Sequence, residues 1–255
     1  MNRKLGRKPR KFDKRIPRAR DLIKLMDFNV PACVDYSSAM PDDLGEMLND
    51  SLGDCTCAAY YHARQVWTAD DDGDGMETAS DSDVLALYEG ACDYRPGNSS
   101  TDQGGVEQDV LAYLLNTGAP VTGGVDKLVA YVEVDKRDQA ALKRVIYDCG
   151  IAYIGVDVPQ SVMDNADDNT IPWDIVGNTQ IVGGHAVILV GYDFETFTCI
   201  SWGKRYKITN AFLIAHLDEA YALIDKSWIE STGDTPFGMT LEDLETAMQG
   251  LKYAD

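Results

Sequence analysis

The chemistry that this sequence could perform centres first on a thiol at a helix start. Residues 48–61 read LNDSLGDCTCAAYY, and the stretch from Cys55 to Thr68 lacks Gly and Pro and keeps helical spacing. This pattern predicts a helix that begins at or near Cys55. Unpaired N–H groups at a helix N-terminus stabilise anions and lower the pKa of a thiol. Cys55 is therefore a candidate nucleophile.

A candidate base lies 130 residues after Cys55. His185 stands in VGGHAVILVGYD, where glycines precede it and the following run predicts a strand. In thiol hydrolases the thiolate attacks, and the imidazole keeps it ionised and later protonates the leaving group. A single histidine in a strand is more often a structural residue than a catalytic one. The presence of Cys55 at a helix start is the reason to consider His185 as a catalytic base. His62 lies two helical turns past Cys55, too far for contact, and the setting of His216 indicates packing.

The elements that must hold this pair fall into helices first and strands second. Periodicity and turn residues predict helices over residues 20–30, 55–68, 81–91, 106–119, 137–150, 211–224 and 240–251, the last with Thr240 as N-cap. Short runs rich in β-branched and aromatic residues predict strands over residues 151–158, 184–193, 196–203 and 205–210. This order is typical of an α+β fold with two subdomains.

Five short motifs follow one another along the chain: DYSS at 35–38, LNDSLGDCTCAA at 48–59, DQGG at 102–105, GGHAVILVGY at 183–192 and SWG at 201–203. Their order and intervals resemble the papain-like cysteine peptidases. SLGDCT is similar to the divergent microbial and bacteriophage branch of that family. The resemblance covers about residues 34–210. It implies an α+β fold with a helical left subdomain that carries the cysteine helix and an antiparallel, β-barrel-like right subdomain that carries the histidine.

The resemblance also implies roles for single residues. Cys55 matches the nucleophile and His185 its base, and alignment on Cys57 instead would break the Gly-x-Cys spacing. Asn49 falls where the family has a glutamine that donates to the oxyanion. Trp202 matches the tryptophan that covers the third catalytic residue. The candidate substrate-binding residues are Gly53, Gly104, Gly105 and Trp202.

Two departures bear on activity. The family's third catalytic residue, an asparagine before Ser-Trp-Gly, is Ile200 here, so we expect a backbone carbonyl or water to orient the imidazole. Loss of a correct third member can cost a triad several orders of magnitude in rate. The side chain of Asn49 is also one methylene shorter than glutamine, which places its amide further from an oxyanion.

Charge divides the chain into a basic arm, residues 1–20, and an acidic remainder. The arm carries ten Lys/Arg and one Asp, and the whole chain has a formal net charge of −19. We expect the arm to contact another protein subunit or an anionic surface. The acidic body makes free nucleic-acid binding unfavourable. We expect an arm over residues 1–30 and a papain-like domain over 31–255, mainly helical to about 125 and then mainly β with C-terminal helices.

Neither a long apolar run nor the apolar region of a signal peptide occurs. These features predict a protein without membrane association, in the cytoplasm or, for a phage-encoded chain, in the virion.

The six cysteines lack a framework spacing and are expected to be free thiols.

An acidic loop at residues 70–81, DDDGDGMETASD, partly matches a calcium-binding loop. Its potential ligands are Asp70, Asp72, Asp74 and Asp81. Asp81 replaces the glutamate that would bind the ion through both oxygens, and acidic loops are often only solvated. We therefore expect no cofactor and keep Ca²⁺ as a weak alternative.

Two classes of function remain open. The first is a cysteine peptidase or amidase that uses Cys55, His185 and Asn49 on a peptide. The second is a papain-like scaffold with weak or lost catalysis, a structural component, for example of a bacteriophage particle, docked through its basic arm. Ile200 favours the second class.

Overall fold

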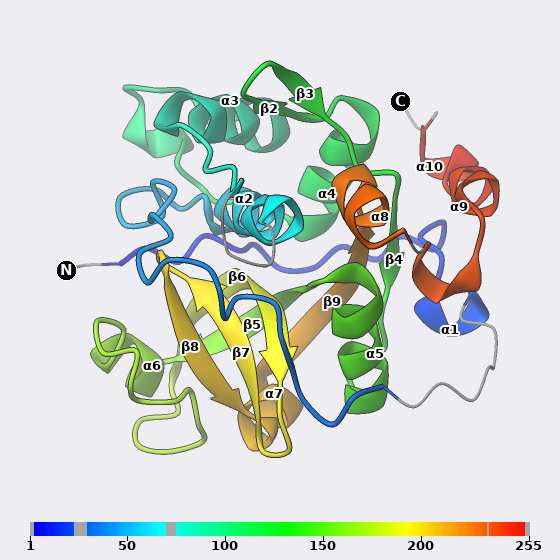
Figure 1. The fold of residues 1–255 in the computed structure, drawn as a ribbon. Helices are drawn as coiled ribbons and strands as arrows, with labels where there is room; N and C mark the ends of the chain where they lie inside the picture. Colours follow the sequence, from blue (N-terminus) through cyan, green and yellow to red (C-terminus); the bar gives the residue numbers. More distant parts are fainter. Residues whose placement is uncertain (1–2, 23–29, 70–74, 234, 253–255) are drawn as a thin grey trace.

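The computed structural model describes residues 3–22, 30–69, 75–233 and 235–252. Helices and one large antiparallel sheet form two halves, with the basic arm running between them (Figure 1). The helices are α1 (Ala19–Leu22), α2 (Cys55–Thr68), α3 (Asp81–Cys92), α4 (Glu107–Asn116), α5 (Gln139–Cys149), α6 (Gln160–Asp164), α7 (Asn210–His216), α8 (Lys226–Thr232), α9 (Leu241–Ala247) and α10 (Gln249–Lys252), with short 3-10 turns at Ser99–Thr101 and Pro236–Gly238.

The strands are β1 (Val34–Asp35), β2 (Ala119–Val121), β3 (Gly124–Asp126), β4 (Ala130–Glu133), β5 (Ala152–Pro159), β6 (Ile181–Tyr192), β7 (Thr196–Ser201), β8 (Lys204–Thr209) and β9 (Leu217–Ile224). The large sheet has the order β4-β9-β5-β6-β7-β8, with β1 on β6, and all its pairs are antiparallel. β2 and β3 form a separate hairpin. The antiparallel sheet confirms the expected fold class, but the sheet is open, because β4 and β8 end it without pairing to each other within the described ranges.

Helix α2 is the buried centre of the molecule. Thirteen of its residues, Cys55 to Trp67, are buried, because it packs against the sheet at β6 on one side and against α3 and α4 on the other. Two hydrogen bonds fix it to the second half of the chain: Trp67 Nε1 donates to the Cys149 carbonyl, and the Tyr153 hydroxyl donates to the Thr56 carbonyl, each at 2.8 Å. These contacts fix the end of α2 to α5 and its start to β5.

Most predicted elements are present, and Thr240 caps α9 as predicted. Ser80 and Thr240 each form a capping box at the start of α3 and α9, and α5 ends at Gly150, whose φ is 76°. The helix predicted over residues 20–30 is described only as α1, because residues 23–29 lie outside the described ranges.

The prediction of one helix over residues 211–224 was wrong in its second part. The chain forms α7 only as far as His216 and then continues as β9. β9 lies between β4 and β5, and its residues are almost all buried. Six of the eight residues in β9 (LDEAYALI) are apolar, and periodicity does not separate such a buried strand from a buried helix. The short strands β2, β3 and β4 were also not predicted.

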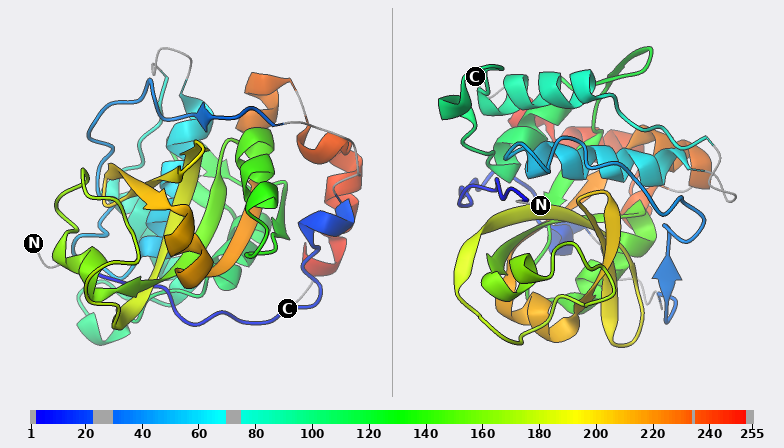
Figure 2. Two further views of the ribbon diagram at one scale, coloured as in Figure 1. Left: turned by 90° about the horizontal axis from the view of Figure 1, so that it is seen from below. Right: turned by 90° about the vertical axis from the view of Figure 1, so that its left-hand side faces the viewer.

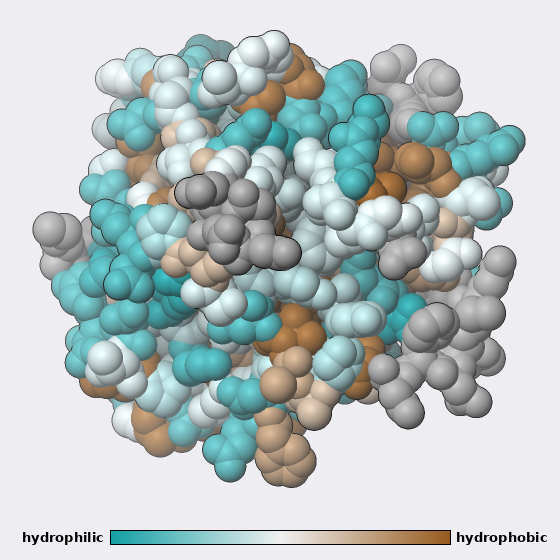
Figure 3. Space-filling view, viewed as in Figure 1, coloured by the Kyte–Doolittle hydropathy of each residue, from teal (hydrophilic) through white to brown (hydrophobic). Residues whose placement is uncertain are grey.

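The surface is largely hydrophilic on the face shown in Figure 3, with hydrophobic side chains in small separate groups. This agrees with the excess of acidic residues in the sequence. No helix in the described ranges combines the length and apolar character needed to cross a bilayer.

Candidate active site

The fold brings Cys55 next to His185. Cys55 is fully buried at the first residue of α2, and its Sγ accepts a hydrogen bond from the backbone N–H of Ala186 at 3.4 Å. Since Ala186 follows His185 on β6, this contact joins the helix start to the histidine strand. The two residues that the sequence selects therefore meet at the junction of the helical half and the sheet.

The imidazole of His185 is held by two neighbours. Its Nε2 lies 2.8 Å from the Oγ of Ser201, and its ring stacks on Trp202 with centroids 4.5 Å apart and 19° between the planes. The other ring nitrogen, Nδ1, is buried and has no hydrogen-bond partner among the described residues. Ser201 thus fixes the ring through one nitrogen and leaves the other free for proton transfer.

Ser201 is a site residue that the sequence analysis missed. We expected a carbonyl or water to orient His185 because Ile200 occupies the third catalytic position, whereas the structure supplies the Ser201 hydroxyl. Ile200 is fully buried, and adjacent strand residues point to opposite faces. Ser201 ends β7, and Trp202 follows with a φ of 47°. The alternation of β7 was the available signal, since a residue next to Ile200 faces the other side.

Asn49 is buried in the loop before α2, where its amide is already engaged. Nδ2 donates to the Leu52 carbonyl and to Oδ1 of Asp54, both at 3.2 Å. An amide group has two hydrogens, so donation to an oxyanion would require one of these bonds to break. Burial raises the pKa of Asp54 well above its ordinary value. The backbone N–H of Cys55 at the helix start is the simpler oxyanion donor.

The basic arm occupies the groove above Cys55. Gly105 N–H donates to the Gly6 carbonyl and Lys8 N–H donates to the Gly105 carbonyl, both at 2.8 Å, while Arg7 N–H donates to the Gly184 carbonyl at 3.0 Å. The arm therefore bonds the loop before α4 on one side and β6 on the other. Figure 1 and the right view of Figure 2 show the N-terminal segment passing between the helices and the sheet.

Glycines allow the arm to approach so closely. A methyl group on Gly6 would overlap the Gly53 carbonyl, and one on Gly104 would overlap the Gly6 carbonyl. Gly104 also has a φ of 75°, a region that favours glycine. Gly53, Gly104 and Gly105, selected as substrate-binding residues, thus all contact a peptide backbone. In this structure that backbone belongs to the chain's own arm.

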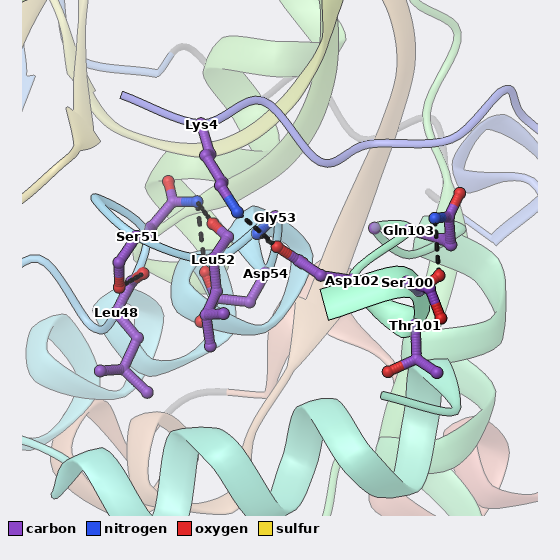
Figure 4. A network of polar contacts seen from close by, with 12 residues as sticks. Lys4, Leu48, Ser51, Leu52, Gly53, Asp54, Ser100, Thr101, Asp102 and Gln103 are labelled. Carbon is purple, nitrogen blue, oxygen red and sulfur yellow. Dashed lines mark hydrogen bonds and ion pairs between the residues drawn. The ribbon is translucent and has the colours of Figure 1, made fainter. Parts of the chain in front are cut away.

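Ion pairs hold the arm along its length. Lys4 reaches Asp102, whose carboxylate also accepts from Gly53 N–H at 2.9 Å and from the Tyr88 hydroxyl at 2.8 Å (Figure 4). The pKa of Asp102 is lowered, because these hydrogen bonds outweigh its burial. The remaining pairs are Arg3 with Glu46 and Asp167, Arg7 with Asp157, Asp218 and Glu219, Arg10 with Glu133, and Lys11 with Asp109.

Under the arm, the cysteine and the histidine are both neutral. Burial raises the pKa of the Cys55 thiol to about 12, even though the Ala186 N–H donates to the sulfur and the backbone of Gly6 also acts to lower this pKa. Burial, with the positive charges of Arg7 and Arg3, lowers the pKa of His185 to about 3. The covered site therefore holds a thiol and an imidazole, not a thiolate–imidazolium pair.

The other candidate residues lie elsewhere. Cys57 interacts with Cys92, away from His185. His62 bonds Gln65 inside α2 at 2.8 Å, and the ring of His216 packs on Phe212.

The acidic loop falls mostly outside the described residues. Asp70, Asp72 and Asp74 belong to residues 70–74, and the described Asp81 is the exposed first residue of α3. Among the described residues, no group of three or more His, Cys, Asp or Glu is placed to hold a metal ion.

No family model and no curated protein sequence matches the chain. Solved structures do match its fold. The cysteine protease xylellain from Xylella fastidiosa superposes with a TM-score of 0.66 at 18% identity, over 88% of this chain and 97% of that one. Procathepsin B S9 from Trypanosoma congolense gives 0.60 at 13% identity, over 88% and 86%. The Carica candamarcensis cysteine protease CMS1MS2, in complex with E-64, gives 0.53 at 16% identity, over 77% and 99%. The chain therefore has the fold of the papain-like cysteine proteases.

Proposed function

We propose that the protein is a papain-like thiol hydrolase acting on peptides, and that its basic arm keeps it inactive until the arm leaves the groove. The observation that carries the proposal is the placement of the Cys55 thiol beside the His185 strand, with the imidazole fixed by Ser201 and Trp202. Such a pair at a helix start is the arrangement that thiolate chemistry requires.

The reaction follows from these positions. His185 takes the proton of the Cys55 thiol, and the thiolate attacks the carbonyl carbon of the bound peptide bond. The Cys55 backbone N–H donates to the oxyanion. His185 then gives its proton to the leaving amine, and water hydrolyses the thioester with His185 again as base. Trp202 shields the ring from solvent, because it stacks on one face of the imidazole.

The arm fills the groove as an inhibitor and not as a substrate. The Gly6 carbonyl oxygen accepts from Gly105 N–H, and the Arg7 N–H donates to the Gly184 carbonyl. The Gly6 carbonyl oxygen, which in a substrate would have to reach the oxyanion donors, is therefore bonded by the loop before α4. Burial under the arm also keeps the thiol protonated.

Hydrolysis of fluorescently labelled casein tests this proposal. We expect no turnover by the wild-type chain and measurable turnover by Gly6→Ala, in which the added methyl group displaces the arm. Turnover must vanish in Gly6→Ala/Cys55→Ala and persist in Gly6→Ala/Cys57→Ala. A displaced arm without hydrolysis would instead support the inactive scaffold as the function.

Ser201 gives a second prediction in the same background. Ser201→Ala removes the only hydrogen-bond partner of His185 Nε2 among the described residues, and a neutral hydrogen bond contributes about 1 kcal/mol, so kcat should fall roughly fivefold. Ser201→Thr keeps a hydroxyl and should retain most of the activity. Steady-state kinetics should show the loss in kcat with KM unchanged. A change confined to KM would contradict a role in orienting the imidazole.

A further inference from the structure

The side chain of Arg7 lies in a pocket built from carboxylates on three elements. Its Nη1 donates to Asp218 Oδ2 at 2.8 Å and to Glu219 Oε1 at 2.9 Å on β9. Its Nη2 donates to Asp157 Oδ1 on β5 at 2.9 Å. The side chain of Arg7 is only 2% exposed. A guanidinium group is thus held by three acidic side chains inside the groove.

A fourth acidic residue, Glu107, lines this pocket, but its carboxyl group forms no hydrogen bond among the described residues. Glu107 at the start of α4 is fully buried, and neither of its carboxyl oxygens has a hydrogen-bond partner among the described residues. The Nε of Arg7 also has none there. Glu107 and Arg7 still interact electrostatically. The pocket therefore offers more acceptors than its present occupant uses.

Gly155 provides the space for this side chain. A Cβ on Gly155 would lie 2.6 Å from Cδ of Arg7 and would also overlap the Glu107 carboxyl group. Gly155 belongs to β5, beside the β9 segment that carries Asp218 and Glu219. The backbone of β5 at Gly155 thus packs directly against the alkyl part of the Arg7 side chain, and the carboxylates surround the guanidinium group.

The chemistry of the pocket selects a guanidinium over other side chains. Arg presents its donors in a rigid planar fork that can bond several carboxylates at once, whereas Lys is a point charge. A neutral side chain would leave buried acids without a counter-charge, which is strongly unfavourable. Charge complementarity of this kind gives specificity against wrong occupants.

The pocket also has a fixed place relative to the thiol. Arg7 follows Gly6, which packs against Gly53 two residues before Cys55, and the Arg7 N–H donates to the Gly184 carbonyl next to His185. A peptide that replaced the arm would run over the same groove and present a side chain to the same acids. We propose that this pocket is a recognition subsite for an arginine side chain of peptide substrates, which compete with Arg7 for it. This inference rests on the proposed function.

Calorimetry tests the subsite without relying on turnover. The protein is Gly6→Ala/Cys55→Ala, and the probes are acetyl-Ala-Ala-Gly-Arg-Ala-Ala-amide and the same peptide with citrulline, the neutral isostere of arginine. We expect the arginine peptide to bind at least about tenfold more tightly, because charged hydrogen bonds are stronger than neutral ones. Adding Asp157→Asn, a change at a half-exposed side chain, should reduce the difference to less than about threefold.

Equal binding of the two peptides would overturn the subsite. The outcome is separate from that of the casein experiment. Hydrolysis without an arginine preference would leave the hydrolase proposal standing and refute this one. An arginine preference without hydrolysis would support the subsite and refute the hydrolase proposal.

A second measurement covers the case in which Gly6→Ala fails to fold or to open the groove. Arg7→Ala empties the pocket while the rest of the arm remains. Millimolar N-ethylguanidinium should then raise the melting temperature of Arg7→Ala by a few degrees, because a ligand that binds only the folded state stabilises it. N-ethylurea should not, and neither compound should stabilise the wild-type chain, where Arg7 fills the pocket. No shift with N-ethylguanidinium would refute the guanidinium site.

Discussion

Gly6→Ala is expected to raise the rate at which iodoacetamide alkylates Cys55 about 10²-fold at pH 7. The alanine methyl group would overlap the Gly53 carbonyl. The arm must therefore leave the groove and lose three backbone hydrogen bonds to Gly105 and Gly184. At about 1 kcal/mol each these bonds hold the closed state by roughly 3 kcal/mol, and each 1.4 kcal/mol is a factor of ten. Mass spectrometry of quenched time points gives the rate at each cysteine.

Gly124→Ala is the matched control for this variant. A methyl group at Gly124 meets nothing within 4 Å, and the residue lies on β3 in the separate hairpin. Its Cys55 should react as slowly as that of the wild-type chain. Fast alkylation of Cys55 in the wild-type chain, or no acceleration in Gly6→Ala, would contradict a groove closed by the arm.

His185→Ala in the Gly6→Ala background is expected to lower casein hydrolysis at least about 10³-fold, as loss of a catalytic base does in triad enzymes. His216→Ala offers a control, since its ring packs on Phe212 in α7. Equal activity of the two variants would remove His185 from the mechanism.

The pH profile of alkylation separates a catalytic base from a structural histidine. In the wild-type chain Cys55 has a pKa of about 12 and His185 of about 3, so thiolate forms only at strongly alkaline pH. Release of the arm removes burial and the charges of Arg3 and Arg7. The pKa of His185 must then rise and that of Cys55 must fall, which moves the alkylation midpoint of Gly6→Ala to lower pH. His185→Ala should return that midpoint toward the ordinary thiol value.

The proposed catalytic pair was accessible from the sequence for a physical reason. A thiol at a helix start is a local pattern that indicates chemistry, and it gave weight to a histidine in a glycine-preceded strand that would otherwise be read as structural. The long strands β5, β6 and β7 were predicted in the same way, because β-branched and aromatic runs are local signals. The fold then only had to bring Cys55 and His185 together, as the contact with Ala186 shows.

Contacts between distant segments were not accessible in this way. Ser201 reaches His185 across β6 and β7; the alternation along β7 indicates which face Ser201 lies on, but not which residue its hydroxyl bonds. The arginine pocket was hidden because residues 217–224 were predicted as a helix, which separates Asp218 and Glu219 from β5. The position of the arm depends on the shape of the groove at Gly53 and Gly104. The positive charge of the arm predicted contact with an acidic surface, but not that this surface belongs to the same chain.

Amide hydrogen exchange of the wild-type chain tests most directly whether the arm occupies the groove. The account predicts that the N–H groups of Arg7, Lys8 and Gly105, which donate to Gly184, Gly105 and Gly6, exchange at least about 10²-fold more slowly than in an unstructured peptide, because exchange requires the arm to open. Exchange at the unstructured rate for Arg7 and Lys8, with normal protection of α2, would show an arm outside the groove and contradict the account.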